Sequence, residues 1–101
     1  MPNGVEKNFS RLLMACAVYR QKYNEWPSQA RLHPVILHDL AQLFDSQNFE
    51  RLAAHLELRT RDRMGLSVGG RGVVEYGERA SDPALVDLAE KWLCVELRRD
   101  L

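Results

Sequence analysis

The sequence predicts an α+β domain: a three-helix bundle, then a small antiparallel β-hairpin or meander, and finally a C-terminal helix, in the order α-α-α-β-β-β-α. Apolar residues recur every three or four positions through residues 5–56, a spacing typical of amphipathic helices. From Leu56 onward the pattern alternates with a period of two, which is typical of half-buried strands. We expect residues 1–101 to form a single domain, because a chain of this length has room for one hydrophobic core.

Three helices are expected in the first half. The first carries an apolar stripe over residues 5–23 and ends before Trp26-Pro27, because a residue that precedes proline is pushed out of the helical region. The segment "WPSQARLH" follows as a connector, with room for a short extended piece over residues 29–32. Pro34 suits the first position of a second helix, and Asp45-Ser46 ends that helix and caps a third.

Short strands are expected over residues 56–61, 66–68 and 73–76. Glycines lie at the edges of these runs and permit the positive φ that tight hairpin turns require. Asp82-Pro83 then begins a last helix, which we expect to continue through residues 84–97.

Composition limits the functional classes. The 14 basic and 14 acidic residues give a net charge of zero, which argues against a strong sequence-independent grip on nucleic acid. No apolar run is long enough to cross a bilayer, and the N-terminus does not resemble a secretion signal, so we expect a cytoplasmic protein with no membrane partner. Cys16 and Cys94 are far apart in apolar stretches, where we expect reduced cysteines that act as small hydrophobes.

Catalytic and metal motifs are weak. Gly65-Leu66-Ser67-Val68-Gly69 matches the G-x-S-x-G pattern of serine hydrolases, but that elbow needs a helix after the serine, and here another strand-like run follows. Residues 69–72 are glycine-rich but lack the Lys-Ser/Thr ending of a phosphate-binding loop. His33, His38 and His55 do not have metal-ligand spacing. We therefore expect no catalytic site, no metal and no cofactor.

Four of the eleven arginines lie within thirteen residues: Arg59, Arg61, Arg63 and Arg71. Two interpretations remain open. The arginines pair with nearby carboxylates, namely Glu57, Asp62, Glu75 and Glu78, or they form a protruding basic finger that binds phosphates.

The order of elements over residues 4–77 resembles that of winged helix-turn-helix domains, although the corner "FDSQNF" is shorter than their usual turn. The resemblance implies that the third helix presents four polar side chains to base edges: Gln47, Asn48, Arg51 and His55. The expected function is a non-catalytic interaction module that binds nucleic acid through this helix and the arginine-rich hairpin. The alternative is a protein-binding adaptor or accessory subunit that acts as a homodimer with no nucleic-acid role.

The last helix is apolar on two stripes. Its own core needs only one stripe, which we assign to Leu85, Leu88, Ala89, Trp92 and Val95. The second stripe contains Val86, Leu93 and Leu97. We expect a second copy of the chain to cover it, with Trp92 and Leu93 as anchors, so that Leu93→Asp would give a monomer or an aggregate. Trp26 is interpreted as packing the end of the first helix onto the domain.

Overall fold

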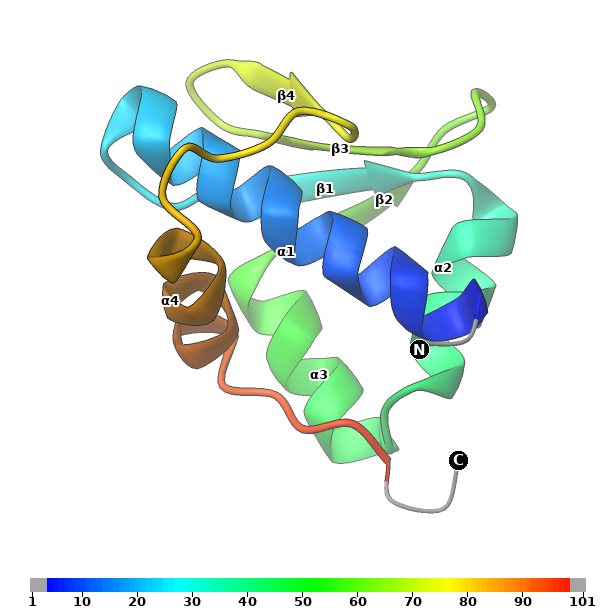
Figure 1. Cartoon of the computed structure of the whole chain (residues 1–101). Helices are drawn as coiled ribbons and strands as arrows, with labels where there is room; N and C mark the ends of the chain where they lie inside the picture. The colour runs from blue at the N-terminus through cyan, green and yellow to red at the C-terminus, as the bar shows by residue number, and fades with distance from the viewer. Residues whose placement is uncertain (1–3, 99–101) are drawn as a thin grey trace.

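The computed structural model describes residues 4–98 of the chain (Figure 1). The α+β prediction is confirmed, with four helices and a four-stranded mixed sheet in this range. The elements in chain order are α1 (Gly4–Tyr23), β1 (Gln29–Leu32), α2 (Pro34–Gln42), α3 (Ser46–His55), β2 (Glu57–Thr60), β3 (Leu66–Gly69), β4 (Val73–Glu75) and α4 (Ala84–Leu93). Among these described helices, none combines the length and the apolar character that crossing a bilayer requires.

The starts of α2 and α3 follow the predicted caps. Pro34 occupies the first turn of α2, and the backbone N–H of Val35 donates to Nδ1 of His33 at 3.2 Å. At the start of α3, the N–H of Asn48 donates to the carboxylate of Asp45 at 2.8 Å. Each cap satisfies a backbone donor that has no partner within its helix, so the sharp corner between the two helices needs no glycine.

The sheet differs from the predicted meander. Its strand order is β2-β1-β3-β4, with β1 parallel to β2 and antiparallel to β3, and β3 antiparallel to β4. The expected connector over residues 29–32 is thus a central strand, since Ala30 and Leu32 are fully buried beneath the helices. The α2–α3 pair carries the chain back to the start of β2, as a parallel pairing requires.

The winged-helix resemblance does not extend to this sheet. A wing formed by the strands after α3 would require β2 and β3 to be neighbours, and β1 lies between them. The prediction of an arginine-rich β2–β3 hairpin is therefore wrong, because β1 pairs with both of these strands.

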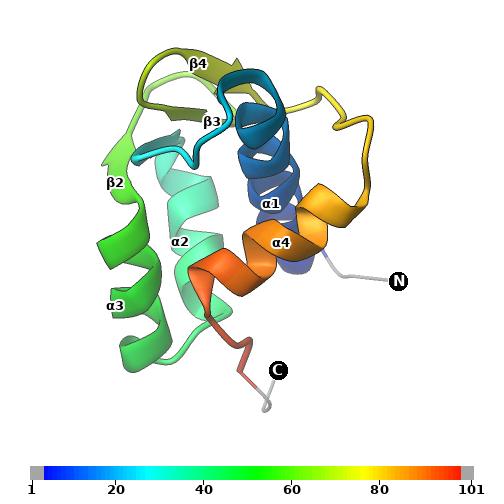
Figure 2. The ribbon, with the colours of Figure 1, turned by 90° about the vertical axis from the view of Figure 1, so that its left-hand side faces the viewer.

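All four helices lie on one side of the sheet, and no described helix covers the other side (Figures 1 and 2). The predicted bundle of the first three helices is not what the contacts show, because α1 packs on α2, α4, β3 and β4, and α3 packs on α4 and β2. The core lies between α1 and the sheet. Leu12 and Cys16 from α1 meet Leu32, Val68 and Val74 from the strands, and all five are essentially inaccessible to solvent.

The last helix is shorter than predicted. It ends at Leu93, and Cys94 adopts a left-handed conformation with φ of 54°. The following segment turns back toward α2 and α3, where Val95 is buried and the N–H of Arg98 donates to the carbonyl of Leu43 at 2.7 Å. Packing of this segment against the domain ends the helix before residue 97.

Candidate functional site

The α3 side chains suggested for base contacts are partly used inside the molecule. Oδ1 of Asn48 accepts a hydrogen bond from the backbone N–H of Glu96 at 3.1 Å. The His55 ring meets the Trp92 ring edge-on, with 5.3 Å between centroids. Gln47 remains exposed. α3 therefore holds α4 and the segment that follows it, and it does not present all four side chains to a ligand.

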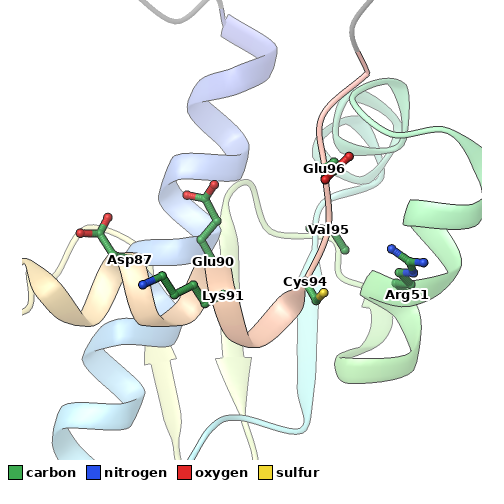
Figure 3. Close-up of a pocket in the computed structure, with 7 residues that line it drawn as sticks. All are labelled: Arg51, Asp87, Glu90, Lys91, Cys94, Val95 and Glu96. Carbon is green, nitrogen blue, oxygen red and sulfur yellow. The ribbon is translucent and has the colours of Figure 1, made fainter.

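Arg51, the fourth of these α3 residues, lines a groove of about 610 Å³ between α3 and the C-terminal end of α4 (Figure 3). Arg51 extends from α3 toward the segment after α4. The other residues that line the groove are Asp87, Glu90, Lys91, Cys94, Val95 and Glu96. Three carboxylates against two cations give these side chains a net charge of −1, which makes the groove a poor site for phosphates.

The four clustered arginines all pair with carboxylates. The pairs are Arg59 with Glu57 at 2.9 Å, Arg61 with Glu75 at 2.9 Å, Arg63 with Glu75 at 3.8 Å, and Arg71 with Glu25. The carboxylate-pairing interpretation is thus correct for Glu57 and Glu75, whereas Glu78 pairs with Lys22 at 3.0 Å. Exposed pairs of this kind stabilise a fold by at most about 1 kcal/mol, so they leave an arginine available to a stronger anion.

Arg61 differs from the other three because its side chain is only 12% exposed. Its guanidinium donates to the carbonyl of Arg63 at 3.1 Å and to that of Met64 at 2.9 Å, in addition to the Glu75 carboxylate. Arg61 therefore holds the loop that carries the chain from β2 to β3 past the end of β1.

A second groove, of about 240 Å³, lies on the uncovered face of the sheet. Its floor is β3, where Ser67 and Gly69 are too small to fill the space between the longer side chains of the neighbouring strands. Gln29 and Arg31 from β1 form one wall. Val73, Glu75 and Arg61 complete the lining.

The polar groups of this sheet-face groove are unevenly satisfied. The side chains of Gln29, Arg31 and Ser67 form no hydrogen bond or ion pair with any residue that the structure describes, and all three can donate. Ser67 is only 5% exposed, and the carboxylate of Glu75 is already held by Arg61 at 2.9 Å. The groove thus offers free donors, among them the unpaired guanidinium of Arg31, while its one carboxylate is already occupied, which favours an anion.

Arg31 also lies directly beside Arg59, its register partner on the adjacent strand β2. Like charges side by side on a sheet destabilise it, and Arg31 has no carboxylate of its own. An anion bound between these guanidinium groups would remove that repulsion. Our sequence reasoning missed Gln29, Arg31 and Ser67, although the polar and apolar alternation of "QARL" is the signal that places Gln29 and Arg31 on one strand face.

The G-x-S-x-G match has no nucleophile geometry. Ser67 lies in the middle of β3, between Arg31 of β1 and Glu75 of β4, and not at a strand-to-helix turn. No group of three or more potential metal ligands comes together within residues 4–98. His33 caps α2 and His55 packs on Trp92, so these two histidines have structural roles.

The stripe of α4 assigned to a second copy does not lie on the surface as predicted. Leu93 is fully buried in the core of its own chain, whereas Leu88, which was assigned to the core, is 48% exposed. Val86 and Trp92 are half-buried against the core, and Leu97 is exposed beyond the end of the helix. The assignment is wrong for Leu88 and Leu93, whereas Ala89 and Val95 are buried as assigned. The homodimer itself stays a prediction.

The two cysteines differ in accessibility. Both are free, and Cys94 is exposed, which contradicts the expectation that both act as buried hydrophobes. Cys16 is completely buried, and this burial raises the pKa of its thiol, so the reactive thiolate does not form at neutral pH. We expect Ellman's reagent to modify Cys94 alone in the native protein and Cys16 only after denaturation. A native Cys94→Ser variant that still reacts quickly would contradict this.

Comparisons of the chain with protein-family models, with curated proteins and with solved structures find no match.

Proposed function

We propose that the protein is a non-catalytic module that binds the phosphate backbone of single-stranded nucleic acid in the sheet-face groove. The observation that carries the proposal is the set of free donors: Gln29, Arg31 and Ser67 all lack partners, and the nearest carboxylate is already paired. Phosphate oxygens accept hydrogen bonds from such groups and supply the missing negative charge.

The charge of this face supports the same ligand. The charged side chains that line the groove are Arg31, Arg61 and Glu75, which gives a net charge of +1 on a chain whose total is zero. The opposite α3–α4 groove carries net negative charge. A polyanion is therefore drawn to the sheet and away from the helices.

The shape of the groove favours single strands over a duplex. Reading a duplex in its major groove requires a protruding helix or ribbon, and α3 lies on the other side of the molecule (Figure 2). Single strands instead follow positively charged grooves along their backbone. In this arrangement Arg31 contacts a phosphate, and the carboxamide of Gln29 is available to a base edge.

Arg31→Gln is the sharpest test, with binding measured by the fluorescence anisotropy of labelled oligo-dT and oligo-U. We expect the parent to bind with a log–log salt slope of about −2, because about three phosphates are contacted and each contributes about −0.7. Removing Arg31 should weaken binding and make the slope shallower by about 0.7. The unliganded variant should be at least as stable as the parent, because the repulsion from Arg59 is gone.

Arg79→Gln is the matched control, because Arg79 is exposed, lies outside the sheet and is equally without a partner among the described residues. It removes the same charge and should leave both affinity and slope nearly unchanged. The proposal fails if the parent shows no binding at about 0.1 M salt, or if the two variants lose affinity equally. Tighter binding of a duplex than of either single strand would also contradict it.

A further inference from the structure

Exposed apolar side chains gather at the end of the molecule where α1, α2 and the β2–β3 loop meet. Six large apolar side chains are exposed within residues 4–98, and three of them line one pocket of about 250 Å³: Met64 at 59%, Val35 at 54% and Tyr76 at 42%. We call it the Tyr76 pocket. Such a cluster on a small domain marks a contact surface, whereas scattered apolar residues do not.

Contacts within the chain fix the rim of the Tyr76 pocket without a ligand. Gly65 has a φ of 100°, and a Cβ at this position would collide with the Tyr76 ring, so glycine lets the ring pack over the loop backbone. Arg61 fixes the same loop through the carbonyl of Met64 at 2.9 Å. The guanidinium of Arg11 lies over the same ring, 5.9 Å from its centroid. Preformed rims reduce the entropic cost of binding.

The floor of the Tyr76 pocket contains polar groups without partners. Asn8 is only 5% exposed, and its Oδ1 accepts from Arg11 at 3.3 Å, but its Nδ2 donates to no described residue. Asp39 on α2 is half-buried, and its carboxylate also has no partner among the described residues. These two groups reach solvent in the pocket, so a ligand can replace their water with hydrogen bonds of its own.

We propose that the Tyr76 pocket docks an extended segment of a partner protein, which inserts one apolar side chain between Val35, Met64 and Tyr76. The backbone of that segment supplies the missing hydrogen bonds: its carbonyl accepts from Nδ2 of Asn8, and its N–H donates to Asp39. A neutral peptide group matches this pair of one donor and one acceptor, whereas an anion would be repelled by Asp39 and a cation by Arg11.

The size and composition of the pocket agree with an anchor side chain. Its volume lies below the ~300–1,000 Å³ of typical small-molecule sites, so it suits one residue of a larger partner. Tyr, Arg and Met, which surround it, are enriched at protein interfaces. The pocket shares no lining residue with the sheet-face groove, although Arg61 lines the groove and holds the loop of the pocket.

The test uses N-acetyl-leucine methylamide as a minimal peptide, with binding followed by the backbone amide signals of the ¹⁵N-labelled full chain. We expect saturable shifts at Gly65, Leu66 and Tyr76 with a dissociation constant of about 1 mM. N-acetyl-serine methylamide should bind at least about tenfold more weakly, because its side chain leaves the apolar rim uncovered. Met64→Glu and Asp39→Asn should each weaken binding of the leucine compound by a similar factor.

Leu88→Glu is the matched control, since it places the same charge on another exposed apolar position, on α4, and should bind like the parent. The amide spectrum of each variant shows directly whether it is folded. Docking is contradicted if the two compounds bind equally, if no shift saturates, or if Met64→Glu binds like the parent. If Asp39→Asn binds the leucine compound as tightly as the parent, the proposed hydrogen bond from the peptide N–H to Asp39 is wrong. Tighter binding of free leucine than of the methylamide overturns the protein partner in favour of a small-molecule site.

Discussion

Leu93→Asp should leave the chain largely unfolded at neutral pH. Leu93 is completely buried between α4 and the rest of the core, so the substitution removes apolar contacts and places an unpaired carboxylate where no water reaches it. Loss of the apolar side chain alone costs about 2–5 kcal/mol, and the buried charge adds several more. The total is comparable with the whole stability of a small domain, about 5–15 kcal/mol. Urea unfolding followed by circular dichroism measures the loss.

Leu88→Asp makes the same chemical change five residues earlier on the same helix, at a position that is 48% exposed. It should cost less than about 1 kcal/mol, as surface substitutions do. A Leu93→Asp protein that unfolds at the urea concentration of the parent would show that the position is not buried in solution. If that variant were a folded monomer while the parent sedimented as a dimer, the original prediction of a dimer anchored by Leu93 would hold.

Helices were predictable because their signals are local. Pro34 and Asp45 act at the ends of the helices that they begin, and the hydrogen bond from Asn48 to Asp45 spans only three residues. The order of elements could be predicted for the same reason, apart from β1.

The place of β1 depends on contacts that no local pattern encodes. Its four residues lie between Pro27 and Pro34, which made the segment look like a connector. It becomes the central strand because Ala30 and Leu32 bury their side chains under helices, with β2 and β3 on either side. Those partners follow at least 25 residues later, so the pairing depends on tertiary contacts and not on the local sequence.

The faces of α4 could not be assigned because both stripes are apolar. Periodicity distinguishes an apolar face from a polar one, but it cannot rank two apolar faces. The position of α1 decides that Ala89 and Leu93 are buried and Leu88 is exposed. The end of the helix at Cys94 has no glycine to mark it, since a cysteine takes the left-handed conformation there.

Both binding surfaces are assembled from distant segments. The sheet-face groove joins Arg31 to Ser67 across the β1–β3 pairing, and the Tyr76 pocket joins Asn8 to Asp39 and Met64. The sequence identified the arginines as a cluster because they are close along the chain. Only the folded structure shows that these arginines differ. Arg61 supports the β2–β3 loop, whereas the others are exposed cations.

Trp26→Ala should destabilise the protein by about 3 kcal/mol, the second largest loss that we expect from a single change. The Trp26 ring stacks on Trp92 of α4, with 4.9 Å between centroids and 9° between the planes, and the Arg20 guanidinium lies 5.3 Å from its centroid. The His55 ring of α3 packs edge-on against the Trp92 ring. The three rings therefore join the segment after α1 to α4 and α3. Removing the ring should loosen all three, which thermal unfolding measures.

Trp26→Phe is the control, because a smaller ring keeps part of the stack and should recover most of the loss. The same two variants distinguish a tryptophan that stabilises the fold from one that binds a ligand, because an exposed ring contributes little to stability. A loss below about 1 kcal/mol in Trp26→Ala would favour the platform. A loss near 3 kcal/mol that Trp26→Phe reverses would show that Trp26 is part of the fold, and that binding belongs to the sheet and the Tyr76 pocket.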